Sequence, residues 1–71
     1  MDKEYIAALI KRHKLNIQNT MFFTSSDVDL IVKGLNKLKK YDIDITALKA
    51  GYLSKFSDNM IQSKKHLLEK I

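Results

Sequence analysis

The feature that most constrains this chain is a short run of alternating residues placed directly before two helical patterns. Residues 16–24, Asn-Ile-Gln-Asn-Thr-Met-Phe-Phe-Thr, alternate in character and contain Ile, Thr and Phe, which favour strands. They lead into Ser25-Ser26-Asp27, a combination typical of a helix start. The pattern predicts one strand followed by a capped helix. The alternative is a simple loop in which Phe23 precedes a Thr24 or Ser25 cap.

A single strand leaves its backbone amides and carbonyls unpaired, so it needs a partner strand. The chain has 71 residues and no cysteine, and small domains without disulfides often gain stability by oligomerising. The partner strand then comes most simply from a second copy. We therefore expect a homodimer in which residues 1–71 form one small domain, with a strand–helix–helix unit at about residues 16–60.

Apolar residues recur at helical spacing through most of the remaining chain. The expected helices cover residues 2–14, 25–41, 46–56 and 59–70, with Thr46 as the cap of the third and a break near residues 57–59. Whether residues 46–70 form one helix or two stays open. The fold class expected is mainly α with one short strand, and the alternative is an all-α bundle of three or four helices. The apolar stripes predicted to be buried are Val28, Ile31, Val32, Leu35 and Leu38, and then Ile45, Leu48, Tyr52, Phe56 and Met60.

The chain carries a formal net charge of +5, and the excess lies at its two ends. Residues 1–15 hold four basic and two acidic side chains, residues 49–71 hold five and two, and residues 16–48 hold four of each. A basic small protein suits nucleic acid, an acidic protein or an anionic membrane surface. Charge alone therefore does not choose between these partners.

No pattern in the sequence indicates catalytic or metal chemistry. The serines lack a glycine-rich elbow, and there is no phosphate loop or dinucleotide fingerprint. His13 and His66 lie far apart, and the four aspartates at residues 27–44 are typical of helix starts and turns. No apolar run is long enough to span a membrane. We expect a cytoplasmic protein that is not an enzyme and that has no metal, cofactor or small-molecule ligand.

Three segments carry a resemblance to a known family. They are residues 20–27 (Thr-Met-Phe-Phe-Thr-Ser-Ser-Asp), the helix that follows to Tyr41, and residues 43–48 (Ile-Asp-Ile-Thr-Ala-Leu). In this order they resemble the ribbon-helix-helix family of small plasmid, phage and archaeal-virus repressors, over about residues 17–60. The resemblance implies two strands that pair antiparallel and enter the major groove of double-stranded DNA. Residues 22–28 also look a little like the end of a wing in winged-helix activators.

The ribbon-helix-helix resemblance further implies which residues contact DNA. Outward side chains of the ribbon read base edges, where Gln suits adenine and Thr can bond a base or touch a thymine methyl. Backbone amides at the start of the second helix hold a phosphate. The residues implied are Asn16, Gln18, Thr20, Phe22, Thr46 and Ala47. From the positive charge of the chain we further expect Lys49 to contact a phosphate.

We therefore expect a sequence-specific DNA-binding protein, such as a small transcriptional repressor or a plasmid or phage regulatory protein. The alternative is a small helical protein–protein interaction module, for example an inhibitor or adaptor, without nucleic-acid binding. The two accounts differ in whether residues 17–23 are extended and paired.

Overall fold

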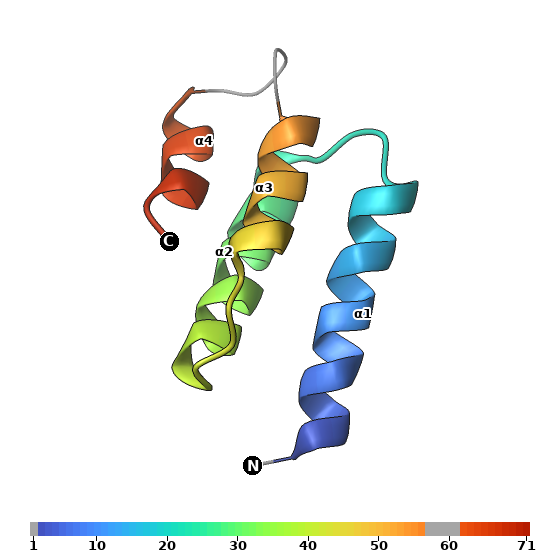
Figure 1. Cartoon of the computed structure of the whole chain (residues 1–71). Coiled ribbons are helices and arrows are strands. Elements are labelled where there is room, and N and C mark those ends of the chain that lie inside the picture. Colours follow the sequence, from blue (N-terminus) through green and yellow to red (C-terminus); the bar gives the residue numbers. More distant parts are fainter. Residues whose placement is uncertain (1, 57–61) are drawn as a thin grey trace.

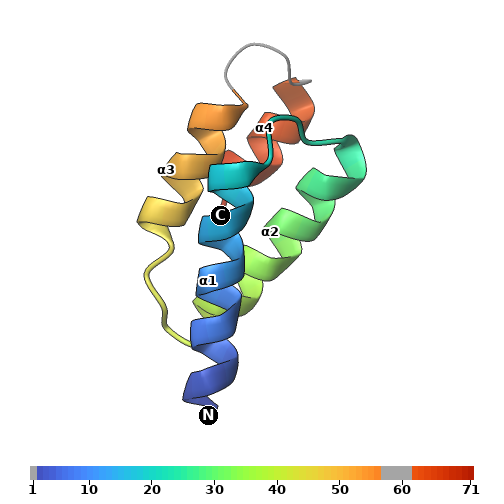
Figure 2. The ribbon, with the colours of Figure 1, turned by 90° about the vertical axis from the view of Figure 1, so that its right-hand side faces the viewer.

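The structure is a computed structural model that describes residues 2–56 and 62–71. Four helices follow one another along the chain, α1 (Lys3–Asn19), α2 (Ser25–Lys40), α3 (Thr46–Lys55) and α4 (Gln62–Glu69). They run alternately up and down, with α1 against α2 and α3, and α4 against the other side of α2 and α3 (Figures 1 and 2). The described part of the chain contains no β-strand, and its fold is an all-helical bundle.

The strand predicted at residues 16–24 is therefore wrong, and the all-α alternative fits the structure. Residues 16–19 form the last turn of α1, and residues 20–24 connect α1 to α2. The helix continues because Ile6, Ile10, His13 and Ile17 keep a helical spacing on one face, while the alternation of residues 16–24 is imperfect. The helix expected at residues 2–14 thus ended more than one turn too early.

The core closes within one chain, which removes the argument that led to a dimer. That argument needed an unpaired strand, and the four helices instead bury apolar side chains against one another. Both predicted apolar stripes point into this core, with Val32 half-buried and Met60 outside the described residues. The homodimer stays a prediction without that support. The buried apolar residues are Ile6, Phe23, Val28, Ile31, Leu35, Leu38, Ile45, Leu48, Tyr52, Phe56 and Leu68.

The start of α2 is fixed by a reciprocal cap. The Asp27 amide donates to the Thr24 hydroxyl at 3.1 Å, and the Thr24 amide donates to the Asp27 carboxylate at 2.8 Å. Phe23, which precedes the cap, is buried in the core. This arrangement fits the alternative of a loop in which Phe23 precedes a Thr24 cap, although the loop covers residues 20–24 only, and it anchors the connection between α1 and α2.

The turn from α2 to α3 is held by aspartates. Asp42 adopts a φ of 61°, in the left-handed region that aspartate tolerates better than most residues. The Asp44 carboxylate accepts from the Thr46 amide at 2.9 Å and from the Thr46 hydroxyl at 2.6 Å. Thr46 is therefore the first residue of α3, and its prediction as the cap is wrong.

The last two helical patterns form separate helices that lie side by side (Figure 1). The predicted break at residues 57–59 lies outside the described residues. Lys64 of α4 pairs with Asp29 of α2 at 2.8 Å. Among the described residues, no helix is both long and apolar enough to cross a membrane.

Candidate functional site

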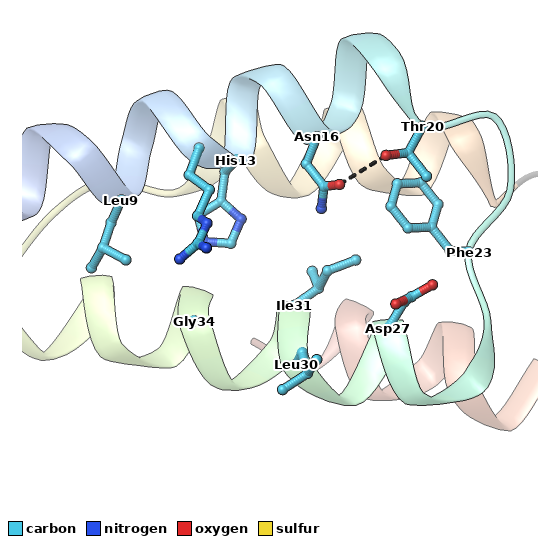
Figure 3. Close-up of a pocket in the computed structure, with 10 residues that line it drawn as sticks. Leu9, His13, Asn16, Thr20, Phe23, Asp27, Leu30, Ile31 and Gly34 are labelled. Carbon is cyan, nitrogen blue, oxygen red and sulfur yellow. Dashed lines mark hydrogen bonds between the residues drawn. The ribbon is translucent and has the colours of Figure 1, made fainter.

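A hollow of about 510 Å³ lies between α1 and α2 (Figure 3). We call it the α1–α2 groove. On the α1 side it is lined by Leu9, Arg12, His13, Asn16 and Thr20. Phe23 from the connecting loop closes one end, and α2 contributes Asp27, Leu30, Ile31 and Gly34.

A connected set of polar side chains forms part of the groove wall. His13 is only 9% exposed, and its Nδ1 lies 2.5 Å from the Tyr52 hydroxyl of α3. The Asn16 amide nitrogen donates to the same hydroxyl at 3.3 Å. The Thr20 hydroxyl in turn donates to the Asn16 side-chain carbonyl at 2.9 Å. These bonds tie α1 to α3 beneath the groove.

The network is consistent with a neutral His13. Since the Tyr52 hydroxyl accepts from Asn16, it can donate its own proton to Nδ1 of His13. The proton of a neutral ring then sits on Nε2. Burial, together with the neighbouring Arg12 charge, lowers the pKa of His13. Burial likewise raises the pKa of Tyr52, so its hydroxyl keeps the proton that the network needs.

Gly34 gives the His13 ring room against α2. An ideal Cβ at this position would lie 2.9 Å from Nε2 and 3.1 Å from Cε1 of that ring. Gly51 of α3 makes a similar approach to α1, where a Cβ would lie 2.9 Å from the Ile17 Cδ1 atom. Gly51 therefore receives a side chain of the same molecule.

These two glycines are expected to respond differently to alanine. The Cδ1 end of Ile17 can rotate away and its Cγ2 atom, 3.3 Å from the Cβ, has to shift by a few tenths of an ångström, so Gly51→Ala should gain up to about 1 kcal/mol from helix propensity less the cost of that shift. The His13 ring is held by Tyr52 and cannot move freely, so Gly34→Ala should lose stability. Urea unfolding of the two variants measures the contrast. Equal stabilisation in both would show that the ring is not held in place.

Large apolar side chains are exposed beside the groove. Leu30, which lines it, is 67% exposed, and Met21 and Phe22 in the loop at its end are 88% and 71% exposed. Phe23, the next residue in this loop, is 6% exposed. The loop is therefore anchored by one aromatic side chain and presents two further apolar side chains to solvent.

The structure separates the residues that the family resemblance grouped together. Asn16 and Thr20 line the groove, half-buried, and Phe22 is exposed in its end loop. Gln18 is exposed in the last turn of α1 but is not part of the groove lining. The alternating face that would place Gln18 beside Thr20 is therefore not formed.

The remaining residues predicted to contact DNA lie on α3, and two of them already form hydrogen bonds within the protein. The Thr46 amide already donates to Asp44, and the two bonds from Thr46, its hydroxyl first, lower the pKa of that carboxyl. An ionised carboxylate therefore occupies the place where a phosphate was expected. Ala47 is exposed. The Lys49 ammonium donates to the backbone carbonyls of Glu69 at 2.8 Å and Ile71 at 3.1 Å, so it closes the end of α4.

Sequence reasoning missed the groove residues Leu9, Arg12 and Leu30. The signal for Leu30 was present, because this leucine lies outside the apolar stripe of its own helix. Within the described residues, no group of three or more His, Cys, Asp or Glu side chains is placed to hold a metal ion. No family model matches the chain, and no curated protein or solved structure is significantly similar to it.

Proposed function

We propose that this chain is a small helical protein–protein interaction module that binds an apolar helical segment of another protein in the α1–α2 groove. The observation that carries the proposal is the exposure of Leu30 in the groove lining, together with that of Met21 and Phe22 in the loop whose Phe23 closes one end of the groove. Single exposed apolar residues are ordinary, but a group of large ones beside a hollow is typical of a binding surface.

The fold itself does not use these side chains. α2 faces the core with Val28, Ile31 and Leu35, and Phe23 already anchors the loop. Fully burying one large apolar side chain against a partner contributes roughly 1.5–3 kcal/mol, so several of them support a specific complex. A structural role would leave them covered by the chain's own helices.

The shape of the groove suits a helix. α1 and α2 run antiparallel, and the α2 lining extends from Asp27 to Gly34 (Figure 3). That span corresponds to about 10 Å, or roughly two helical turns. A partner helix would place apolar side chains at positions i, i+3 or i+4, and i+7 between the two helices, as in other helix-in-groove complexes.

A second candidate function is binding of double-stranded DNA, as the family resemblance implied. The observation that favours it is a row of lysines on α2, where Lys33, Lys37 and Lys40 line a shallow hollow with Asn36 and Tyr41. Such binding would depend on phosphate contacts and would weaken steeply with salt, with log affinity falling by about 0.9 per contact for each unit of log salt. It would not require Leu30.

The interaction-module proposal predicts a result for selection from a displayed library of helical peptides. Enriched peptides should carry apolar residues at helical spacing, and Leu30→Ser should weaken their binding by about tenfold or more, since it removes one buried leucine. The matched control is Leu67→Ser, because Leu67 is 41% exposed on α4, away from the groove. This control should bind like the wild type. Failure to enrich any peptide, or equal loss in both variants, would contradict the proposal.

A further inference from the structure

The rim of the α1–α2 groove carries mainly positive charge. Arg12 lines it from α1. On α2, Lys33 and Lys37 follow Leu30 by three and seven residues, so they continue the same helix face. The Lys37 ammonium lies 5.1 Å from the centre of the Tyr5 ring of α1, which places it across the gap between the two helices.

The acidic side chains near the groove offset this charge only in part. Asp27 is the one acidic residue in the lining, and its carboxylate already accepts the Thr24 amide at the helix cap. Asp29 is bonded to Lys64 of α4 at 2.8 Å. The groove lining itself holds one cation, Arg12, and one carboxylate, Asp27. Lys33 and Lys37 lie past the Gly34 end of this lining, in the neighbouring hollow on α2, so the excess of positive charge lies at that end of the groove.

From this combination we infer that the occupant of the groove is an acidic amphipathic helix of another protein. The inference rests on the proposed function and names the chemistry of its partner. The apolar face of the helix lies between α1 and α2 against Leu9, Leu30 and Ile31. Carboxylates on one flank face Arg12, and those on the other flank face Lys33 and Lys37.

Charge complementarity selects this occupant over others. Rim ion pairs add modest affinity, but like charges placed opposite one another disfavour the wrong partner and slow its association. A second copy of this chain carries +5 itself, so it would bring a net positive charge to a positive rim. A basic or neutral apolar helix gains the contacts of the groove without the attraction of the rim.

The test uses three designed helical peptides with identical apolar anchors and with Glu, Gln or Lys on both flanks. Their dissociation constants for the full chain are measured by fluorescence anisotropy at low and high salt. The Glu peptide should bind about tenfold more tightly than the Lys peptide at low salt, because several surface ion pairs of modest strength act together. The difference should shrink as salt screens the rim.

Two double variants with equal net charge locate the effect. Lys33→Glu/Lys37→Glu should reverse the preference so that the Lys peptide binds best. The control Lys14→Glu/Lys70→Glu changes two exposed lysines outside the groove lining and should keep the preference for Glu. Circular dichroism of both variants confirms that each one is folded before binding is compared.

Each other result overturns a specific part of the account. If the three peptides bind equally and Leu30→Ser still abolishes binding, the groove is a docking site but its partner is not selected by acidity. If no peptide binds, the proposed function fails together with this inference. Dimerisation that depends on Leu30 in sedimentation would identify a second copy as the occupant. If the chain binds duplex DNA in a salt-sensitive way, and Leu30→Ser does not change this binding, the ligand is a nucleic acid and not an acidic helix.

Discussion

Replacing Tyr52 by alanine is expected to unfold the protein or to bring it close to unfolding. Tyr52 is fully buried, and its ring packs edge-on against Phe23 and His13 and stacks on Phe56. Truncation of a buried aromatic residue costs about 3–5 kcal/mol. A chain of 71 residues has a total stability of roughly 4–10 kcal/mol, so one such loss approaches the whole of it.

Tyr52→Phe separates the contribution of the hydroxyl to stability from that of the ring. It keeps the packing and removes only the group that bonds His13 and Asn16, which should cost about 1–3 kcal/mol because buried polar groups lose a partner. Tyr5→Ala is the matched control, since Tyr5 is partly exposed on α1. Chemical denaturation followed by circular dichroism should rank the variants Tyr52→Ala, Tyr52→Phe, Tyr5→Ala from least to most stable. A Tyr52→Ala variant as stable as Tyr5→Ala would contradict the packing described here.

Acidification below neutral pH is expected to destabilise the fold through His13. A histidine whose pKa is lower in the folded chain than in the unfolded chain binds fewer protons when folded. Stability therefore rises with pH in the interval between the two pKa values. The contribution is fully present above about pH 6.5, the value of an unperturbed histidine, and is lost progressively as the pH falls from there through the folded pKa.

The groups around His13 support this direction. Arg12 is the adjacent charge on α1, Tyr52 is the titratable group that meets the ring from α3, and on α2 the ring meets uncharged Gly34. Asp27 lines the same groove from the start of α2, but its carboxylate bonds the Thr24 amide. A protonated ring would have to donate from Nδ1 to Tyr52, and the Tyr52 proton would then need another acceptor.

Denaturant unfolding between pH 7.5 and pH 5 measures this effect. The wild type and His66→Gln, a change in an exposed residue of α4, should both lose stability as the pH falls. His13→Gln should lose much less, because it removes the titrating group. Should that variant fail to fold, proton NMR of the wild-type rings gives the same information. A His13 ring that titrates at or above pH 6.5 would rule out the effect.

The core of the bundle was predictable from sequence because its signal is local. The stripe from Val28 to Leu38 and the stripe from Leu48 to Phe56 follow a simple helical period, and both are buried. The expected bounds of α2 and α3 agree with the structure within about one residue at each end. Periodicity of this kind depends only on which residues share a helix face.

The end of α1 was not predictable in the same way. Residues 16–19 contain two asparagines, which have low helix propensity, and the Phe, Thr and Ile around them favour strands. What keeps Asn16 in the helix is tertiary, since its side chain bonds Tyr52, which lies 36 positions further along the chain. A contact at such a separation leaves no periodic signal in the sequence.

The candidate site was hidden for a related reason. The groove depends on how far α1 stands from α2, which is limited by His13 against Gly34, while Ile17 against Gly51 limits the distance between α1 and α3. Nothing in the sequence indicates that Lys49 has a partner within the protein, but in the fold its ammonium donates to the carbonyls of Glu69 and Ile71. Net charge in the sequence indicated an anionic partner without choosing its kind, whereas only the fold shows which cations lie near the groove.

The most direct test of the account is to map where a selected acidic helical peptide binds. Backbone amide shifts of the isotope-labelled chain are followed by NMR as this peptide is added. The account predicts that the largest changes fall on residues 9–23 and 27–37, on both sides of the α1–α2 groove, and that Leu30→Ser needs about tenfold more peptide, or more still, to reach them. Changes confined to α3 and α4, or an unchanged titration in Leu30→Ser, would contradict it.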